Sequence, residues 1–201
     1  MQSEHFSTIT LNDFQWLNEP SNWNLCDNVL KVSTDNKTDF WQETWYKFHF
    51  NTGHLYGIDI KDDFTFQACI EADFSKLYDQ AGLMIYLDEK HWLKTGMEYN
   101  DGQPMIGSVL TNEVSDWATG PFIGDPKKFW IRLSKIEDTV CIKYSTNKKS
   151  WILLRLCPFP LNDTYFVGLM CCTPQREGLN VKFSDVAFTT PIRDILHSNN
   201  C

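Results

Sequence analysis

A row of chemically different side chains lies within residues 92–98, where the sequence alternates with the period of a β-strand. Side chains in a strand point to opposite faces at successive positions, so every second residue shares a face. One face therefore carries an indole, a cation, a gap and a carboxylate: Trp92, Lys94, Gly96 and Glu98. At about 3.3 Å per residue, Lys94 and Glu98 are about 13 Å apart. The glycine between them leaves room for a bound molecule, so we predict a ligand-facing surface here.

Further aromatic and polar residues are candidates for the same site. Apolar faces of sugars stack on indoles and planar polar groups bind hydroxyls, which favours a carbohydrate ligand. Trp41, at the tip of a polar loop, is either part of the core or such a platform. Arg132 would add a donor fork for a carboxylate or phosphate if it faces the same sheet. The predicted ligand-binding residues are Trp41, Gln80, Trp92, Lys94, Glu98, Asp116, Trp117 and Arg132.

The same residues also allow a purely structural interpretation. In that case Trp92 and Trp130 cap the sheet, while Lys94 and Glu98 pair with neighbouring strands. The sequence alone leaves both interpretations open.

Catalysis needs a more specific arrangement of carboxylates. Retaining glycoside hydrolases use two carboxyl groups about 5 Å apart, and inverting enzymes use a separation of about 6.5 to 9.5 Å. Glu98 and Asp116 are the pair that could act as acid and base across a strand and a loop. Ser-His-Asp and Cys-His groupings, phosphate loops and dinucleotide fingerprints do not stand out. We therefore assign no catalytic residue and expect no cofactor.

Metal binding is not expected from the candidate ligands. Asp35 and Asp39 could offer oxygen ligands to calcium, but the glycine and the closing acid of an EF-hand loop are missing, which favours an Asx-turn. His49 and His54 lack a partner at metal spacing, and the 7 Cys include no C-x-x-C pair for zinc. The cysteines are expected to be reduced and mostly buried, except Cys201, which we expect to be exposed and reactive.

Charge and composition narrow the partners and the location. The formal net charge is -8 and the pI is about 5.0, without a long basic block. This argues against nucleic acid and anionic membranes as partners. The first seven residues do not resemble a signal peptide, and no apolar run is long enough to span a bilayer. A cytoplasmic location is the expectation that follows.

The elements that must position these residues show strand periodicity. Residues 64–74 alternate apolar and polar side chains, which indicates a strand with one buried face. The apolar run from Ala81 to Leu87 is short enough for a buried strand. The dipeptide Asp101-Gly102 is a hairpin signal before a strand at 105–112, and residues 113–121 are predicted to be a loop. Further strands are expected at 29–33, 46–51, 92–99, 129–136, 139–144, 151–156, 165–172 and 179–188.

The fold class follows from the number and spacing of these strands. The chain has 201 residues and 14% aromatic residues, and helical periodicity is scarce, so we expect an all-β fold. Many short strands without an internal repeat predict a two-sheet antiparallel β-sandwich of jelly-roll type. We predict one domain over residues 1–190 and a polar C-terminal tail over 191–201.

Five motifs together resemble the signature of a known family. They are, in order, Trp16-Leu17-Asn18-Glu19-Pro20, Thr38-Asp39-Phe40-Trp41, Tyr78-Asp79-Gln80-Ala81-Gly82-Leu83-Met84, Trp92-Leu93-Lys94-Thr95-Gly96-Met97-Glu98 and Ser115-Asp116-Trp117. Over nearly its whole length the chain is similar to the "regulation of enolase" family, a domain-of-unknown-function family. The resemblance implies a concanavalin A-like lectin/glucanase fold, and a shared fold does not by itself imply a shared function.

The resemblance does not extend to the catalytic pattern of the glucanases. Glucanases of this fold typically carry Glu-x-Asp-x-x-Glu on one strand. The nearest match begins at Glu71 and Asp73, and Lys76 stands where the second glutamate would be. Glucanase catalysis of the usual kind is therefore not expected.

Three functions remain open at this point. The favoured prediction is a non-catalytic protein that binds a carbohydrate or a sugar phosphate on the concave face of the sandwich. The second is a regulatory module that binds a glycolytic enzyme such as enolase, as the family name implies, because aromatic residues rimmed by charge also describe an interface. The third is a glycoside hydrolase that uses Glu98 and Asp116. A concave pocket favours a sugar, and a flat surface favours a protein.

Overall fold

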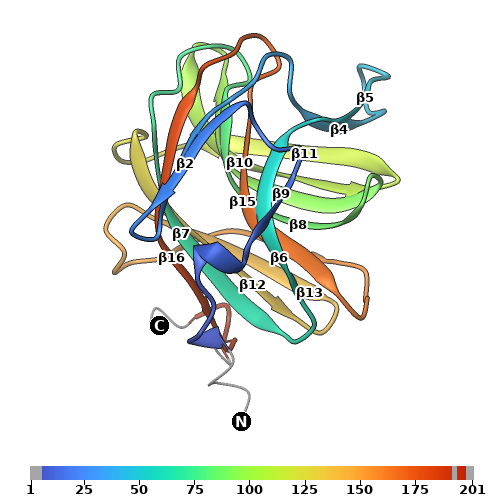
Figure 1. Cartoon of the computed structure of the whole chain (residues 1–201). Coiled ribbons are helices and arrows are strands. Elements are labelled where there is room, and N and C mark those ends of the chain that lie inside the picture. The colour runs from blue at the N-terminus through green and yellow to red at the C-terminus, as the bar shows by residue number, and fades with distance from the viewer. Residues whose placement is uncertain (1–5, 192–193, 198–201) are drawn as a thin grey trace.

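Two antiparallel sheets of seven strands each form a sandwich in the structure, a computed structural model that describes residues 6–191 and 194–197 (Figure 1). Sheet A has the order β1(Gln15–Leu17), β6(His54–Ile60), β15(Tyr165–Cys172), β8(Gln80–Asp88), β9(His91–Asn100), β10(Gln103–Asn112) and β11(Val114–Pro121). Sheet B has the order β14(Ile152–Pro158), β13(Thr139–Ser145), β12(Lys128–Ile136), β7(Phe64–Ala72), β16(Asn180–Thr189), β3(Val29–Ser33) and β2(Asn22–Cys26). A 3-10 helix, η1(Leu11–Asp13), precedes the first strand. The predicted all-β, two-sheet sandwich is confirmed.

The main hydrophobic core lies between the two sheets. Strand β7 places Phe64, Phe66 and Ile70 in this core, as the alternation of its sequence predicts. From sheet A, Leu83 of β8 and Leu93 of β9 belong to the same core. Full burial of a side chain of this size stabilises a fold by about 1.5–3 kcal/mol. The six cysteines in the described part of the chain are free, and Cys201 lies outside that part.

Sheet A is also covered on its outer face, which points away from sheet B. Met84 of β8 and Met170 of β15 alternate with core residues and belong to a second hydrophobic cluster, together with Trp92 and Val109. Because both faces of β8 are covered, its sequence is a continuous apolar run rather than an alternation.

A small hairpin provides this outer cover. Strands β4(Phe40–Gln42) and β5(His49–Asn51) pair with one another and form a separate two-stranded sheet. Figure 1 shows the hairpin projecting beside β11 at the side of the sandwich. The ring of Phe40 is buried in the second cluster, with its centroid 6.0 Å from that of Trp92 and 6.4 Å from that of Tyr86. The hairpin is thus attached to sheet A by side chains, not by a shared strand ladder.

Two segments differ from the sequence-based expectation. Residues 113–121 are not a loop: Glu113 makes the turn with a φ of 66°, and strand β11 then pairs along β10. Glycine and proline near its end are weak strand formers, which hid this strand in the sequence. In the segment predicted as a strand from Tyr46, Tyr46 lies in a turn and the strand begins only at His49. Strands β1, β2, β4 and β6 are additional, and the other boundaries agree within two residues.

In the described residues, no helix is long and apolar enough to cross a membrane.

Gly82 and Gly96 face each other across β8 and β9 and allow the two strands to approach closely. A Cβ added at Gly82 would overlap the backbone oxygen of Thr95, and one added at Gly96 would overlap that of Ala81. These atoms belong to the backbone, so a methyl group fits only if the strands move apart. The glycine that forms the gap between Lys94 and Glu98 is therefore also a packing requirement of the sheet.

We expect Gly82→Ala to lower the free energy of unfolding by about 3 kcal/mol, because overpacking forces a backbone shift in the middle of sheet A. Urea unfolding followed by tryptophan fluorescence measures the change. Gly120→Ala in β11 is the matched control, because a Cβ there meets no atom within 4 Å. Equal stability of the two variants would show that the close approach of β8 and β9 is not required.

Candidate ligand-binding site

A pocket of about 400 Å³ lies between the outer face of sheet A and the β4–β5 hairpin. Six aromatic side chains line it: Trp41, Tyr46, Phe48, Phe50, Tyr78 and Trp117. Its polar lining consists of Lys37, Asp39, Gln80, Lys94, Glu98 and Gln175. Small-molecule sites typically have volumes of about 300–1,000 Å³ and combine apolar walls with a few polar groups. The pocket has both properties.

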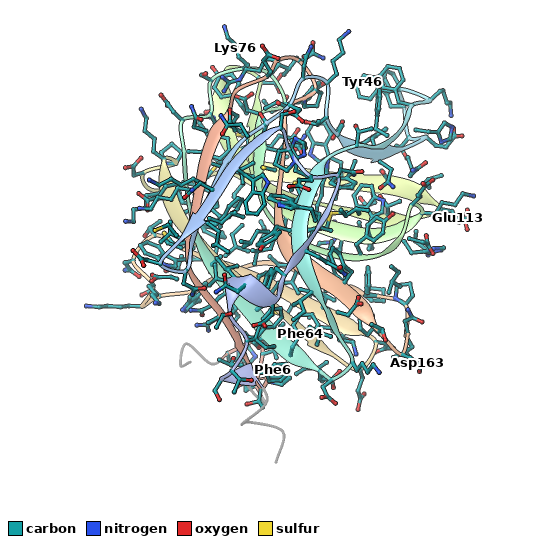
Figure 2. All side chains as sticks on the ribbon, in the orientation of Figure 1. Phe6, Tyr46, Phe64, Lys76, Glu113 and Asp163 are labelled. Atoms are coloured by element: carbon teal, nitrogen blue, oxygen red, sulfur yellow. The ribbon has the colours of Figure 1, made fainter. Side chains whose placement is uncertain are left out.

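The aromatic walls hold one another through ring contacts. Trp41 lies edge-to-face with Trp117 at a centroid distance of 6.4 Å, and Trp117 has the same relation to Tyr78 at 6.4 Å. On the hairpin, Tyr46 and Phe48 stack with centroids 5.5 Å apart. The hydroxyl oxygens of Tyr46 and Tyr78 are 2.8 Å apart, so a hydrogen bond joins the hairpin to the opposite rim. Figure 2 shows Tyr46 on the hairpin at the periphery of the molecule.

The buried ammonium group of Lys94 joins the floor of the pocket to the hairpin. Its Nζ donates to Oδ1 of Asp39 at 3.1 Å and to the backbone oxygen of Phe40 at 2.8 Å. Burial lowers the pKa of Lys94, but Asp39 and other nearby acidic groups outweigh this effect and raise it. The ring of Trp92 adds a cation–π contact with a centroid distance of 5.7 Å. Lys94 therefore stays charged, and its charge is compensated.

Glu98 stands at the other end of the floor and is only 8% exposed. Burial raises its pKa from the ordinary 4.5 to about 7, against the opposing influence of Lys94. The nearby indole N–H of Trp117 also lowers the pKa of Glu98. This N–H group is itself buried and makes no hydrogen bond of normal geometry to a described residue. Buried polar groups are almost always hydrogen-bonded in folded proteins. Glu98 and Trp117 thus present a carboxyl group and a donor that a polar ligand would satisfy.

The rim beside Glu98 is fixed by a buried carboxylate. Asp79 accepts two hydrogen bonds from Arg176, at 2.8 Å from Nε and 2.5 Å from Nη2. It also accepts the backbone N–H groups of Ser75 and Lys76 at 3.0 Å each. This clamp holds the loop before β8 against the loop after β15. It supports Tyr78 at a φ of 63°, which is uncommon for a bulky residue and persists only where neighbouring structure enforces it.

Five of the eight predicted ligand-binding residues line the pocket: Trp41, Gln80, Lys94, Glu98 and Trp117. Trp41 combines the two roles considered from the sequence, because it belongs to the second hydrophobic cluster and also forms a wall of the pocket. The pocket brings these five residues together, and their part in ligand binding stays a prediction.

Trp92 is not among the residues that line the pocket. It shares a face with Lys94, as the alternation predicts, but the ring of Phe40 covers it and leaves it 0% exposed. Its Nε1 donates to the backbone oxygen of Glu89 at 3.1 Å. The direct contact with ligand that we predicted for Trp92 is therefore not available, because Trp92 packs against Phe40 and Lys94 under the hairpin.

Asp116 and Arg132 are both turned away from the pocket, which corrects their assignment. Asp116 precedes Trp117 on β11 and therefore faces the other side of sheet A, where its carboxylate accepts Nη2 of Arg155 at 2.7 Å. Arg132 belongs to β12 of sheet B, and its guanidinium carbon lies 3.8 Å from the ring centroid of Trp151. The condition that Arg132 faces the same sheet is not met.

The position of Asp116 also removes the acid–base pair considered for hydrolysis. Glu98 and Asp116 lie on opposite faces of sheet A, so one substrate bond cannot lie between them. Asp39, the other carboxylate of the pocket, holds Lys94 and accepts the backbone N–H of Phe40 at 2.8 Å. Across residues 6–191 and 194–197, no group of three or more His, Cys, Asp and Glu residues could hold a metal ion.

Sequence reasoning missed the hairpin side of the pocket. Tyr46, Phe48 and Phe50 all line it, and none was among the predicted ligand-binding residues. The signal was an aromatic residue at every second position, 46, 48 and 50, within a polar stretch, although only Phe50 lies in strand β5. Asp39 was noted for a local turn, and both Asp39 and Tyr78 belong to family motifs, but neither was predicted to bind a ligand.

The comparisons with known proteins concern nearly the whole chain. Residues 16–191 match the family described as "Protein of unknown function (DUF1349)". The chain is 44% identical over 182 residues to the Saccharomyces cerevisiae protein "Regulation of enolase protein 1", covering 90% of this chain and 92% of that protein. A crystal structure of a functionally unknown protein from Saccharomyces cerevisiae has a TM-score of 0.90 at 43% identity and covers 92% of this chain and 100% of that chain.

More distant structures share the sandwich alone. The GH43 protein BlXynB from Bacillus licheniformis, in its K247S mutant, has a TM-score of 0.70 at 14% identity, and the similarity covers 89% of this chain and 37% of that one. Carbohydrate binding module CBM66 from Bacillus subtilis has a TM-score of 0.57 at 14% identity, covering 89% of this chain and 98% of that one. At this identity the similarity establishes the fold and not the ligand.

Glu98 makes the stability of the protein depend on pH in a defined window. Because its pKa is raised in the folded state, the penalty for its ionisation is absent below about pH 4.5 and complete above about pH 7. The penalty is about 3 kcal/mol, at about 1.4 kcal/mol for each unit of pKa. We expect Glu98→Gln to remove this pH-dependent loss of stability and to be more stable than the wild type at pH 8. Urea unfolding between pH 4.5 and pH 8 measures the free energy of unfolding of both proteins.

Glu177→Gln is the matched control for this prediction, because Glu177 is exposed. It should keep the pH profile of the wild type. A Glu98→Gln variant with the same pH profile as the wild type would contradict the burial of this carboxyl group.

Proposed function

The chain belongs to the DUF1349 family of proteins of unknown function, and we propose that it binds a carbohydrate, without turning it over, in the pocket beneath the β4–β5 hairpin. The resemblance seen in the sequence motifs is thereby confirmed at the level of the family. The observation that carries the proposal is the combination of aromatic walls with two buried polar groups that lack full partners, the carboxyl of Glu98 and the indole N–H of Trp117.

The shape and chemistry of the pocket support a sugar ring. Trp41 and Trp117 offer ring surfaces on which the apolar face of a sugar can stack. Gln80 and Glu98 lie opposite each other on β8 and β9 and can bind neighbouring hydroxyl groups. The fold that the chain shares with a carbohydrate binding module agrees with this proposal, although fold similarity alone would not carry it.

A phosphate group on the sugar has less support than a neutral sugar. Lys94, the cation at the floor, is already neutralised by Asp39 and bound to the backbone of Phe40. Lys37 remains at the exposed rim, where solvent weakens its attraction for an anion. A sugar phosphate would also meet the carboxyl group of Glu98.

The lack of turnover is proposed from the arrangement of the carboxylates. A glycoside hydrolase needs an acid and a second carboxylate on either side of the bond that is cleaved. Asp116 lies on the far face of the sheet, and Asp39 is committed to Lys94. Glu98 is thus left without a free partner of this kind in the pocket.

Binding of neutral monosaccharides and disaccharides by isothermal titration calorimetry tests the proposal. We expect Trp117→Ala to weaken the binding of any sugar that binds by about two- to tenfold, because ring contacts are worth about 0.5–1.5 kcal/mol. Trp130→Ala is the matched control, because Trp130 lies on sheet B and donates to Asp185 at 3.0 Å. Failure of every sugar to bind would refute a carbohydrate site, and a hydrolysis product would refute the lack of turnover.

A regulatory interaction with a glycolytic enzyme is the second candidate, and the tip of the hairpin favours it. Trp45 is 83% exposed and has a φ of 64°, in a region that is strained for a bulky side chain. Exposed Trp is enriched among the residues that dominate protein interfaces. The name of the yeast relative, "Regulation of enolase protein 1", makes enolase the partner to test.

Surface plasmon resonance with immobilised enolase tests this second candidate. We expect Trp45→Ser to weaken binding by at least about tenfold, as for an interface hot spot. Leu161→Ser is the matched control, because Leu161 is 72% exposed but lies outside the hairpin. Loss of binding in both variants would point to a general effect of surface polarity, and the absence of binding by the wild type would refute the candidate.

A further inference from the structure

The charges of the pocket floor are unequally compensated. Lys94 and Asp39 form a pair with Nζ and Oδ1 at 3.1 Å, and the backbone oxygen of Phe40 accepts a second hydrogen bond from the same Nζ. These two charges therefore cancel within the floor. Glu98 has no comparable partner in the described part of the chain and carries the remaining charge of the floor when it is ionised. Lys37 is at the exposed rim, where its charge is hydrated.

The walls around this carboxyl group are aromatic on several sides. The rings that line the pocket come from the hairpin, from β11 and from the loop before β8: Trp41, Tyr46, Phe48, Phe50, Tyr78 and Trp117. The face of an aromatic ring carries partial negative charge and attracts a cation within about 6 Å of its centroid. An ammonium group is the ligand chemistry that both the rings and the carboxylate favour.

We infer that the pocket takes a ligand with a positively charged amino or alkylammonium group, which lies against Glu98 and between the rings of Trp41, Trp117 and Tyr78. The inference rests on the proposed carbohydrate site and narrows its ligand to an amino sugar or to a sugar that carries an amine. A neutral hydroxyl group could donate to Glu98 but would leave its charge without a counter-ion. An anionic group would be repelled by Glu98.

The titration of Glu98 gives this inference a characteristic pH dependence. A bound cation favours the ionised carboxylate, so its affinity should rise as the pH passes upward through about 7, by about tenfold between pH 6 and pH 8. Of the other groups that face Glu98, Lys94 has a raised pKa and stays charged, while Tyr78 and Cys172 have raised pKa values and stay neutral. Asp39 is held by Lys94.

Isothermal titration calorimetry with three sugars that share the glucose ring and differ only at position 6 tests the inference. The probes are glucose, 6-amino-6-deoxyglucose and glucose 6-phosphate, at pH 6 and pH 8. Tetramethylammonium chloride and tert-butyl alcohol are added as a charged and an uncharged probe of similar shape. The variants are Glu98→Gln, which keeps the shape of the side chain but not its charge, and Lys37→Met, which removes the cation of the rim.

We expect the amino sugar to bind at least about tenfold more tightly than glucose at pH 8, with a smaller difference at pH 6. Glu98→Gln should abolish the difference between the amino sugar and glucose, and Lys37→Met should leave this difference intact. Tetramethylammonium should bind more tightly than tert-butyl alcohol, again only when Glu98 is present. Circular dichroism of both variants at each pH verifies that they are folded.

The outcomes separate this inference from the proposed function. Equal or tighter binding of glucose relative to the amino sugar overturns the cation inference and leaves the carbohydrate site intact. Tightest binding of glucose 6-phosphate, lost in Lys37→Met, also overturns it. Binding of tetramethylammonium in a Glu98-dependent manner, with no sugar bound, supports the cation site and refutes the carbohydrate. No binding by any probe refutes both.

Discussion

The buried ammonium group of Lys94 is the contact on which the pocket depends. A charge that is removed from water must be paired and hydrogen-bonded, because the cost of burying it alone exceeds most stabilising terms in a small protein. Lys94 rises from the middle of sheet A, and its two acceptors, Asp39 and the backbone of Phe40, lie at the start of the hairpin. The hairpin is therefore held at one place above the sheet by a directional contact. Hydrophobic packing against Trp92 alone would allow the hairpin to slide along the sheet.

Several polar contacts reinforce this attachment, and they come from the motifs that define the family resemblance. Asn18 donates to the backbone oxygens of Asn51 and Gly53 at 2.9 Å each, which fixes the end of the hairpin. On the opposite side, Ser115 accepts the backbone N–H of Gln42 at 2.9 Å. Motifs that lie far apart along the chain thus share one task, the placement of a short hairpin on the outer face of sheet A.

The extent to which the sequence predicts this site follows from the range of the interactions involved. Alternation within one strand is local, so the row from Lys94 to Glu98 and the buried strand before it could be predicted from the residues. The cover over Trp92 comes from a segment about fifty residues away, and alternation says nothing about it. The assignment of Arg132 to the site was wrong for the same reason, because long-range pairing decides to which sheet a strand belongs. The assignment of Asp116 was wrong because its segment was predicted to be a loop, where neighbouring side chains need not point in opposite directions, and is strand β11.

The independence of the hairpin from both strand ladders affects how this family can diversify. Strands β4 and β5 pair only with each other among the described strands, so substitutions, insertions or deletions between Glu43 and Phe48 leave the register of the fourteen sandwich strands unchanged. Evolution can therefore exchange the aromatic rings on this side of the pocket while the fold and the Lys94 contact are retained. The architecture separates the part of the chain that must be inherited from the part that is free to acquire new selectivity.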